Sequence, residues 1–367
     1  MTLTFLEALE GAEHEQVQLL QDPEIDMVAI LAIHDTSHGP AFGGIRRYPY
    51  RTGAEALRDV LRLSKAMTYK CLMTGIAGGG GKGVLVDRPG LDLAEAYRRI
   101  GRFVQNMGGR FYTGPDIGTS DRELAWLSES TRFVTLPGEE GPGDLSTATA
   151  RGVLAGIRAV LRFLARKDPR LPGDPAASSY EGLRFAVQGL GDVGSKVVRE
   201  LCAKGAEVCV SEVREEALSP IREELEVEVE DPGRILDREC DVFVPCALGG
   251  ILHDLASERL RCRAIAGSAN NILAKPEHGR LLHDHGILIA PDYVINSGAL
   301  ILGANFHLTG DRDQEEAIDH IEDILFEIFM RSESEGVSTC ELADRMAEER
   351  LSKNRGAMFF PDADRDR

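Results

Sequence analysis

The chain has 367 residues, with 42 Lys and Arg against 60 Asp and Glu, which gives a formal net charge of −18. This length predicts two domains with sizeable cores, and the acidic balance argues against general binding to nucleic acids or anionic membranes, because like charges repel. The longest apolar runs, such as MVAILAI at 27–33, have the length of a strand and are too short to cross a bilayer.

The first part of the chain alternates short apolar runs with amphipathic segments. Residues 27–34 are rich in branched apolar side chains and predict a strand, and residues 53–69 place apolar side chains at helical spacing and predict a helix. The glycine run at 78–81 predicts neither a helix nor a regular strand, because consecutive glycines lose too much backbone entropy in either. Further elements are expected as a strand at 83–87, a helix at 92–108 and a strand ending in a turn at 110–120.

The second part of the chain follows a Pro- and Gly-rich acidic stretch at 137–144, which predicts a linker. A long amphipathic helix at 147–167 comes next, with Ser146 or Thr147 as its cap. From residue 183 strands alternate with helices, the pattern of a doubly wound parallel sheet. Its later strands are expected at 240–247, 264–269 and 287–292, followed by charged helices at 313–331 and 338–352 and a frayed tail.

The seven cysteines have no CxxC spacing and form no cluster with histidine. Reduced thiols in a cytoplasmic protein are therefore expected, with no bound metal. The N-terminal segment MTLTFLEALEGAEHEQ has neither a basic region nor an apolar core, so no signal peptide is expected.

The segment GLGDVG at 189–194 has the GxGxxG pattern of dinucleotide-binding loops. It follows an apolar strand and opens a helix, the context in which the glycines allow a tight turn and a close approach to a pyrophosphate at the helix N-terminus. Glu212 ends the next predicted strand, 18 residues past Gly194, where a carboxylate accepts ribose hydroxyls and favours NAD over NADP. Arg214 weakens that preference, since it can receive a 2′-phosphate, and a coincidental strand–turn–helix is the weaker interpretation. The residues assigned to the cofactor on this pattern are Gly189, Leu190, Gly191, Asp192, Val193, Gly194, Ser195 and Glu212.

Lysine is scarce in this chain, which has eight lysines against 34 arginines. Two of the eight, Lys70 and Lys82, bracket the segment that contains the glycine run. A buried lysine can lose its proton and act as a base, whereas arginine cannot, so the choice of lysine here indicates chemistry. A surface lysine on a flexible loop is the alternative for either one alone.

Two loop motifs add candidate site residues. Asp116 in YTGPDIGTS has Pro115 and Gly118 beside it, so a loop can carry its carboxylate into a cleft. Taken alone, it is more simply an ordinary turn aspartate. Gly43 and Gly44 form a second glycine pair whose backbone amides can reach a ligand.

Nine segments follow one another between about His14 and Asn305: HDTSHGPAFGGIRRYPY, ALRDVLRLSKAMTYK, GGGGKGVLV, YTGPDIGTS, TARGV, GLGDVGSKV, PCALGG, AGSANNILA and APDYVINSGAL. In this order they resemble the blocks of the leucine/phenylalanine/valine dehydrogenases, a group of the glutamate dehydrogenase family, with leucine dehydrogenase the most similar. The resemblance implies an α/β protein of two domains with a cleft between them. A substrate-binding and oligomerisation domain is expected at 1–142, with 335–367 packing back on it, and a Rossmann dinucleotide domain at 143–334.

The resemblance also implies roles for individual residues. Lys82 matches the catalytic lysine of the family, Asp116 matches the aspartate that handles protons at the amino group, and Lys70 matches the lysine that binds the substrate carboxylate. The residues implied to bind the substrate are Gly43, Gly44, Lys70 and Asn270, with Phe42 and Leu300 at its side chain. The further residues implied to lie at the cofactor are Arg46, Thr149, Ala247, Leu248, Asn270 and Asn296. Asn270 is preferred to its neighbour Asn271.

The implied reaction is the reversible, NAD-dependent oxidative deamination of a nonpolar L-amino acid to its 2-oxo acid, ammonia and NADH. Leucine, valine and isoleucine come first among the substrates. Phe42 and Leu300 stand where leucine dehydrogenases usually have Leu and Val, and the added volume favours a compact or differently shaped side chain. Phenylalanine or tryptophan stacked on Phe42 is the alternative, and repacking without any change of preference stays open. The resemblance implies a homo-oligomer, a dimer or an octamer.

Two other functions fit the residues less well. A 2-hydroxy acid dehydrogenase needs a catalytic histidine with an acidic partner, and none of the nine histidines lies in such a constellation. A non-catalytic NAD-binding relative would be expected to lose Lys82 or Asp116, and both are present.

Overall fold

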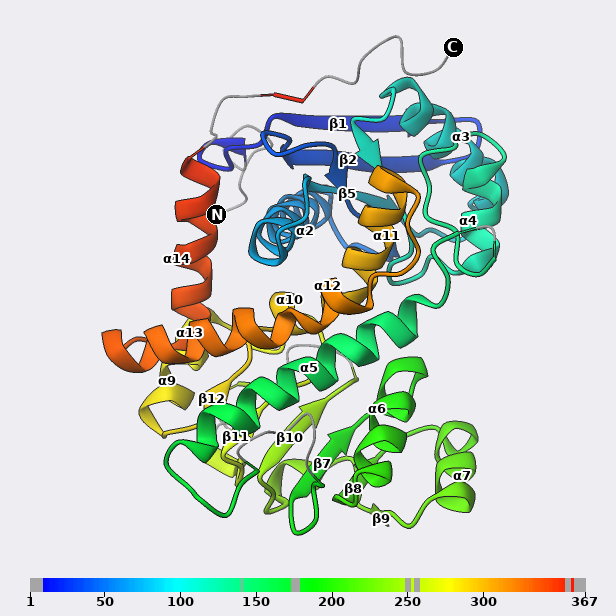
Figure 1. Cartoon of the computed structure of the whole chain (residues 1–367). Helices are drawn as coiled ribbons and strands as arrows, with labels where there is room; N and C mark the ends of the chain where they lie inside the picture. The colour runs from blue at the N-terminus through cyan, green and yellow to red at the C-terminus, as the bar shows by residue number, and fades with distance from the viewer. Residues whose placement is uncertain are drawn as a thin grey trace. The chain divides into compact units, whose positions relative to one another are not determined.

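The computed structural model describes residues 9–139, 141–172, 179–247, 252–253, 258–353 and 358–359 (Figure 1). The chain divides into two compact units. The first unit comprises Met1–Gly143, Gly303–Arg312 and Ala347–Arg367, and the second comprises Asp144–Leu302 and Asp313–Met346.

The first unit is built on a mixed sheet in which β5 is the central strand (Figure 1). The strands are β1 (Gln16–Asp22), β2 (Met27–Asp35), β3 (Ala41–Phe42), β4 (Ile45–Tyr48), β5 (Gly79–Val86) and β6 (Phe111–Tyr112). β1 and β2 form an antiparallel pair, β2 is antiparallel to β5, β3 and β4 run parallel to β5, and β6 runs parallel to β3. The sheet order is β1-β2-β5-β3-β6, with β4 also beside β5. Strands β2, β3 and β4, which precede the glycine run in the chain, and β6, which follows it, therefore lie in one sheet with β5.

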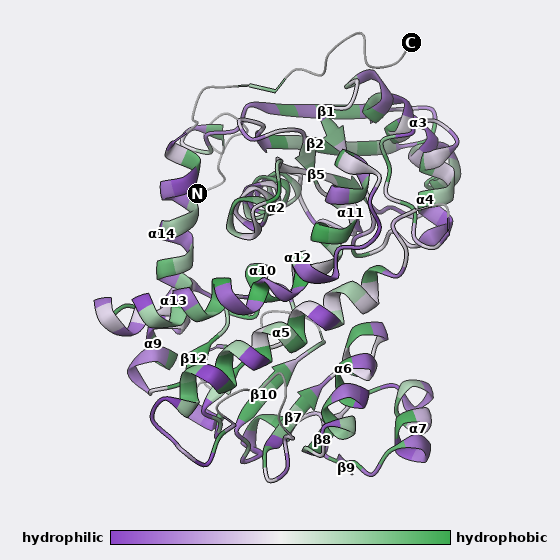
Figure 2. Cartoon of the chain, viewed as in Figure 1, coloured by the Kyte–Doolittle hydropathy of each residue, from purple (hydrophilic) through white to green (hydrophobic). Residues whose placement is uncertain are grey.

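Helices cover both faces of this sheet because β2 alternates its apolar side chains between them. Ile30 and Ala32 pack into one core with Leu57 and Val60 of α2 (Gly53–Thr74). The intervening residues of β2 pack into a second core formed with α3 (Leu93–Asn106) and α4 (Asp121–Ser128). In Figure 2 hydrophobic residues are frequent on the strands of this sheet and on α2, whereas α3 and α4 carry both hydrophobic and hydrophilic residues.

The glycine run is where the expectation from sequence was wrong, since three of its four glycines lie inside β5. A Cβ at Gly79 would lie 1.8 Å from the carbonyl oxygen of Asp35, and one at Gly80 would lie 2.1 Å from the backbone nitrogen of Thr68 in α2. No real Cβ tolerates such distances, so glycine is required for the neighbouring backbones to pack this closely. The entropy lost by ordering glycine is offset by this packing, and Lys82 is the first long side chain after the run.

The second unit has a parallel six-stranded sheet of order β12-β11-β10-β7-β8-β9. Its strands are β7 (Arg184–Gln188), β8 (Glu207–Ser211), β9 (Glu228–Val229), β10 (Val242–Pro245), β11 (Ala264–Ile265) and β12 (Leu288–Ile289). Counted from β7, this is the order 3-2-1-4-5-6 of the doubly wound dinucleotide-binding fold. The expected fold class, two α/β domains of which the second is a Rossmann domain, is therefore confirmed.

The helices of the second unit come before, between and after its strands in the chain. They are α5 (Leu145–Ala165), α6 (Asp192–Ala203), α7 (Glu215–Glu224), α9 (Pro276–Asp284), α10 (Asp292–Ile295), α12 (Glu315–Asp319) and α13 (Ile321–Glu335), together with the short helix η1 (Ile235–Asp237). α11 (Gly298–Thr309) and α14 (Thr339–Ser352) continue from the second unit into the first.

The cap of α5 differs from the expectation. Asp144, and not Ser146 or Thr147, is the N-cap, and its Oδ1 accepts the backbone N–H groups of Ser146 and Thr147 at 2.9 and 3.0 Å. A carboxylate at this place also interacts favourably with the positive end of the helix dipole. Asp144 is the first residue of the second unit, at the end of the stretch predicted as a linker.

The two units differ from the sequence-based boundaries in two places. Gly303–Arg312 groups with the first unit, where His307 Nε2 lies 2.9 Å from Thr135 Oγ1. The returning C-terminal segment starts at Ala347 and not at 335, because Glu348 pairs with Lys65 at 2.9 Å and Arg350 donates to the carbonyl oxygen of Leu72 at 2.8 Å. The expected frayed tail, 361–367, lies outside the described residues.

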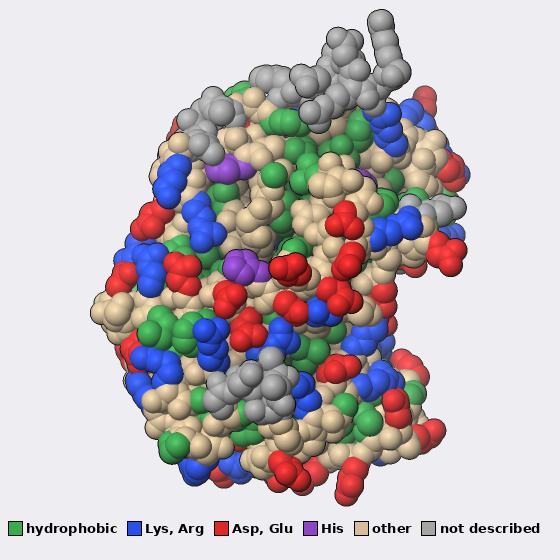
Figure 3. Space-filling view, viewed as in Figure 1, with side chains coloured by type: hydrophobic (Ala, Val, Ile, Leu, Met, Phe, Trp, Pro, Cys, Tyr) green, Lys and Arg blue, Asp and Glu red, His purple; other side chains and the backbone are tan. Residues whose placement is uncertain are grey.

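Within the described ranges, no helix combines the length and the apolar character needed to cross a membrane. On the face seen in Figure 3, acidic and basic side chains are interspersed.

Candidate functional site

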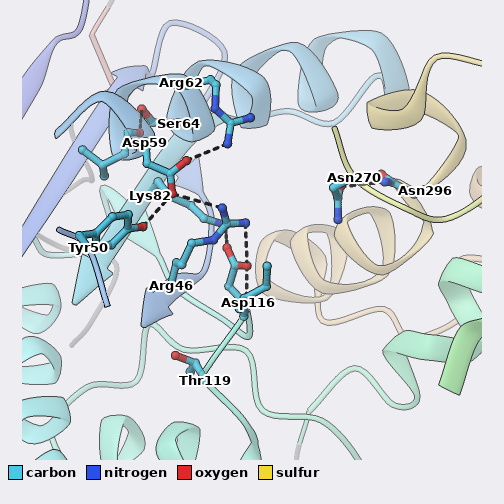
Figure 4. Close-up of polar contacts among 12 residues, drawn as sticks. Arg46, Tyr50, Asp59, Arg62, Ser64, Lys82, Asp116, Thr119, Asn270 and Asn296 are labelled. Carbon is cyan, nitrogen blue, oxygen red and sulfur yellow. Dashed lines mark hydrogen bonds and ion pairs between the residues drawn. The ribbon is translucent and has the colours of Figure 1, made fainter. Parts of the chain in front are cut away.

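Lys82 and Asp116 form a buried ion pair in the first unit (Figure 4). Lys82 lies on β5, and Asp116 lies in the loop that follows β6. Their side chains are 8% and 10% exposed. Gly80, two residues before Lys82 on the strand, faces α2, so Lys82 points to the same side of the sheet. The sheet thus unites two residues that are 34 positions apart in sequence.

Two further donors hold the Asp116 carboxylate. Arg46 on β4 donates from Nη2 to Oδ1 at 3.2 Å, and the backbone N–H of Ile117 donates to the same oxygen at 2.6 Å. Burial by itself raises the pKa of Asp116, but the charges of Lys82 and Arg46 outweigh burial and lower it to about 2. Asp116 is therefore ionised throughout the physiological pH range.

Asp59 and Tyr50 extend this cluster, and no sequence motif pointed to them. Asp59 Oδ2 accepts hydrogen bonds from Arg46 Nη1 at 3.2 Å and from the Tyr50 hydroxyl at 2.7 Å. Burial raises the pKa of Asp59, but the hydrogen bonds from Tyr50 and Arg62 and the charge of Arg46 outweigh it, so the pKa is lowered overall. The one available signal was Arg62 three residues after Asp59 on a predicted helix, a spacing that is common on solvated faces.

Beside this cluster, the backbone at Gly43 and Gly44 packs closely against the backbone of two other segments. A Cβ at Gly43 would lie 1.8 Å from the carbonyl oxygen of Gly81, and one at Gly44 would lie 2.3 Å from that of Pro115. The glycine pair therefore lets the 43–44 segment lie directly between the strand that carries Lys82 and the loop that carries Asp116.

Lys70 and Phe42 lie in the same unit. Lys70 is on α2, three residues after Met67, whose Cγ is 3.5 Å from the Cβ position at Gly43, so Lys70 shares the side of the helix that faces the glycine pair. Phe42 is only 3% exposed, and its ring stacks on that of Tyr112 at 5.4 Å between centroids. Phe42 thus packs in an aromatic cluster beside the glycine pair.

Asp116 makes the free energy of unfolding depend on pH at the acid end. Its pKa is about 2 in the folded chain and 3.8 for an ordinary aspartate. The stabilisation is therefore fully present above about pH 4 and is lost as the pH falls through about 2. We expect urea unfolding between these pH values to show a component of about 2 kcal/mol in the wild type that Asp116→Asn lacks. Equal pH slopes for the two proteins would contradict this assignment.

The dinucleotide motif of the second unit forms a turn between β7 and α6. Gly189 has φ +96°, which favours glycine, and a Cβ at Gly194 would lie 2.1 Å from the carbonyl oxygen of Gly189. A Cβ at Gly191, the N-cap of α6, would meet only Arg214 Nη2, at 4.0 Å. The first turn of α6 contains Asp192, Val193 and Ser195 and has no side-chain cap. These observations fit a pyrophosphate, which needs open backbone and helix N–H groups.

Glu212 anchors the dinucleotide loop. Its Oε2 accepts the backbone N–H of Leu190 at 2.8 Å, and its Oε1 accepts those of Val213 and Arg214 at 2.9 and 3.0 Å. Burial raises the pKa of Glu212, but these hydrogen bonds outweigh it and lower the pKa, so the carboxylate is ionised. The side chain of Arg214 is 54% exposed and lies beside Gly191.

The remaining predicted residues of the second unit lie on the loops and helices that follow its strands. Asn296 Nδ2 donates to Asn270 Oδ1 at 2.8 Å, so the sheet brings these two together (Figure 4). Ala247 packs against the dinucleotide loop, since a Cβ placed at Gly189 would lie 3.0 Å from the Cβ of Ala247. Thr149 is half-buried in the first turns of α5, and Leu300 is half-buried on α11. Leu248 lies outside the described residues.

No group of three or more His, Cys, Asp or Glu side chains within the described ranges is arranged to hold a metal ion.

Comparison with known proteins gives similarity over almost the whole chain. The family model described as Glu/Leu/Phe/Val dehydrogenase, dimerisation domain, matches residues 14–133, and the model described as Glutamate/Leucine/Phenylalanine/Valine dehydrogenase matches residues 210–335. Phenylalanine dehydrogenase from Bacillus thermotolerans is 43% identical over 349 residues, which cover 93% of this chain and 89% of that protein. Leucine dehydrogenase from Geobacillus stearothermophilus is 39% identical over 353 residues, which cover 95% of this chain and 94% of that protein.

A solved structure is also similar. The crystal structure of L-tryptophan dehydrogenase from Nostoc punctiforme superposes with a TM-score of 0.80 at 34% identity, covering 96% of this chain and 99% of that one. These three proteins are named for three different amino acids, and identities of 43% and 39% are too close to choose between phenylalanine and leucine.

Proposed function

The chain belongs to the Glu/Leu/Phe/Val dehydrogenase family and is an amino acid dehydrogenase, and on this basis we propose that it oxidises a nonpolar L-amino acid with NAD to the 2-oxo acid, ammonia and NADH. The observation that carries the proposal is the buried ion pair of Lys82 and Asp116 beside Arg46. A base and a proton carrier in direct contact are what oxidative deamination followed by hydrolysis requires.

Lys82 acts as the base on the water that attacks the iminium carbon of the oxidised substrate. Lysine suits this step because its ammonium can give up a proton, which a guanidinium cannot. Asp116 binds the substrate ammonium and carries protons to and from the nitrogen. Because Lys82 and Asp116 are in contact, a proton can pass between them without leaving the site. Lys70 keeps its charge and pairs with the substrate carboxylate.

The second unit would hold the cofactor. The loop Gly189–Gly194 and the first turn of α6 would receive the pyrophosphate, and Glu212 would accept a ribose hydroxyl while keeping the loop in place. Asn296 would lie on the nicotinamide side, Ala247 and Thr149 would lie beside the cofactor, and Asn270 would lie near both the substrate and the cofactor. When bound, NAD supplies the acceptor for the hydride that leaves Cα.

Leucine, valine and isoleucine are the leading substrates of the proposal, with Phe42 and Leu300 at the side-chain pocket. Phenylalanine or tryptophan is the second candidate. One observation favours it: the Phe42 and Tyr112 rings stack beside the glycine pair, and the Tyr112 ring in turn contacts that of His307 at 4.7 Å. Aromatic clusters favour flat apolar ligands, with about 1 kcal/mol for each ring pair.

The test of the proposed function is turnover by the purified protein. NADH formation is followed for each proteinogenic L-amino acid, with NADP tested in parallel. Turnover of a nonpolar amino acid with release of ammonia is expected. Absence of turnover with every amino acid, in protein shown to be folded and to bind NADH, would overturn the proposal.

Replacement of Glu212 by glutamine tests the cofactor preference. The amide retains an oxygen for the N–H of Leu190 but removes the charge that repels a 2′-phosphate. We expect the ratio of kcat/KM for NAD to that for NADP to fall by about tenfold or more. Arg214→Ala is the control and is expected to leave the ratio unchanged or raise it. An unchanged ratio in Glu212→Gln would show that Glu212 serves only as the loop anchor.

A further inference from the structure

An open pocket of about 430 Å³ lies in the first unit, between the first turns of α2 and the chain of β4 and the residues after it. Arg58 and Arg62 line it from α2, one helical turn apart, and Tyr48 and Tyr50 line it from the other side. Ile117, next to Asp116 in sequence, forms part of the rim and is 50% exposed. The pocket thus adjoins the loop that carries Asp116.

Positive charge exceeds negative charge in this pocket, although the chain as a whole is strongly acidic. Three arginines face two carboxylates there, those of Glu55 and Asp59. Asp59 already accepts hydrogen bonds from Arg46, Arg62 and Tyr50. Arg58 is exposed and has no hydrogen-bond or ion-pair partner among the described residues. An exposed guanidinium beside a second one, with phenol rings opposite, is a combination that binds an oxyanion such as phosphate.

A chain of alternating charges connects the pocket to the candidate catalytic pair (Figure 4). Arg62 Nη2 lies 2.7 Å from Asp59 Oδ1, and Arg46 Nη1 lies 3.2 Å from Asp59 Oδ2. The other nitrogen of the same guanidinium, Arg46 Nη2, lies 3.2 Å from Asp116 Oδ1, and Asp116 pairs with Lys82. The inner members are largely buried, with 12% exposure for Arg46 and 18% for Asp59, so their interactions are weakly screened by solvent.

We propose that this pocket is an effector site for a phosphate-bearing small molecule, bound by Arg58 and Arg62 and coupled through Asp59 and Arg46 to Asp116. The coupling part of the proposal rests on the proposed function, because it assigns Asp116 a role in proton transfer. The site itself is independent of that function.

The direction in which phosphate changes kcat follows from the order of the charges between the pocket and Asp116. A phosphate draws Arg62 away from Asp59, so Asp59 attracts Arg46 more strongly and Arg46 attracts Asp116 less. Loss of that attraction moves the pKa of Asp116 upward, toward the working pH. Proton transfer is fastest when the pKa of the carrier approaches the pH, so phosphate is expected to raise kcat, by about threefold for a rise of one in the pKa.

The first experiment measures binding without turnover. The thermal midpoint of the full chain is recorded with inorganic phosphate and with potassium chloride at equal ionic strength. A ligand that binds only the folded state raises the midpoint. We expect an increase in the wild type and in Arg280→Ala, a control that removes an exposed helical arginine of α9, and no increase in Arg58→Ala. Equal shifts in all three proteins would overturn the site, even if the chain turned over no amino acid.

The second experiment measures kcat and the KM for NAD at saturating substrate, with the same salts and variants. An increase in kcat with phosphate in the wild type and in Arg280→Ala, absent in Arg58→Ala, supports the coupling. The same increase in Arg58→Ala would make it a general salt effect and would overturn the proposal. Competition between phosphate and NAD, lost in Arg58→Ala, would also overturn it, because the pocket would then belong to the cofactor site.

Discussion

Replacement of Lys82 by alanine is expected to lower kcat by about two to four orders of magnitude, the usual contribution of a positioned general base. The binding of NADH is expected to be retained, since the loop at 189–194 and Glu212 belong to the second unit, whereas Lys82 and its partner Asp116 belong to the first. Steady-state kinetics and NADH fluorescence titration measure the two quantities separately. Lys82 also contributes the largest attraction that lowers the pKa of Asp116, so this pKa is expected to rise in the variant.

Lys82→Arg is the matched control for charge. It keeps a cation beside Asp116 but cannot supply a base, because guanidinium does not lose its proton in proteins. We expect it to be as inactive as Lys82→Ala while restoring part of the low pKa of Asp116. Near-normal turnover in either variant would contradict the assignment of Lys82 as the base. Lys82 would then be only a structural partner of Asp116.

Asp116→Asn is expected to have the second large effect. Asparagine has nearly the same shape and can still receive the N–H of Ile117, but it can neither carry a proton nor balance Lys82 and Arg46. We expect kcat to fall by about two to four orders of magnitude. The two cations would then be buried without their shared anion, and removal of one member of a buried pair costs roughly 3–5 kcal/mol of unfolding free energy.

Urea unfolding at neutral pH, with the folded fraction measured under assay conditions, separates the two effects of Asp116→Asn. Asp92→Asn is the control, because Asp92 caps α3 through Glu95 N at 3.1 Å and lies in an exposed hydrogen bond. Because asparagine also accepts the N–H of Glu95 as an N-cap, Asp92→Asn is expected to lose about 0.5 kcal/mol or less and to keep its kcat. If Asp116→Asn unfolded normally and kept its activity, both the ion pair and the proton-transfer role would be contradicted.

Local sequence patterns predicted much of the fold. The apolar run at 27–34 became β2, the helical spacing at 53–69 became α2, and GLGDVG opens α6 after β7. In each case the signal lies within one segment, where periodicity and turn chemistry act over a few residues. The failures concern segments whose conformation is set by distant neighbours. The glycine run is a strand because Asp35 and Thr68 pack against it.

Some residues of the candidate site were likewise predicted from local sequence, and others were found only through tertiary contacts. Lys82 and Asp116 were selected by residue type and loop context, and their pairing depended on the sheet that places β5 next to β3 and β3 next to β6. Asp59 and Tyr50 could not be selected, because a carboxylate on a helix and a tyrosine after a strand are ordinary until they meet around Arg46. Glu212 was expected at a ribose, and the structure adds that it binds the loop at Leu190.

The sequence by itself determined the alternation of strands and helices in the second unit, its dinucleotide turn and the residue types capable of the chemistry. These follow from periodicity, from glycines at tight turns and from the difference between lysine and arginine. Only the tertiary structure decided which charges are neighbours. The Coulomb energy of two ions depends on their separation in space and on how well water is excluded. Neither quantity can be calculated from the 34 positions that separate Lys82 from Asp116 in the chain.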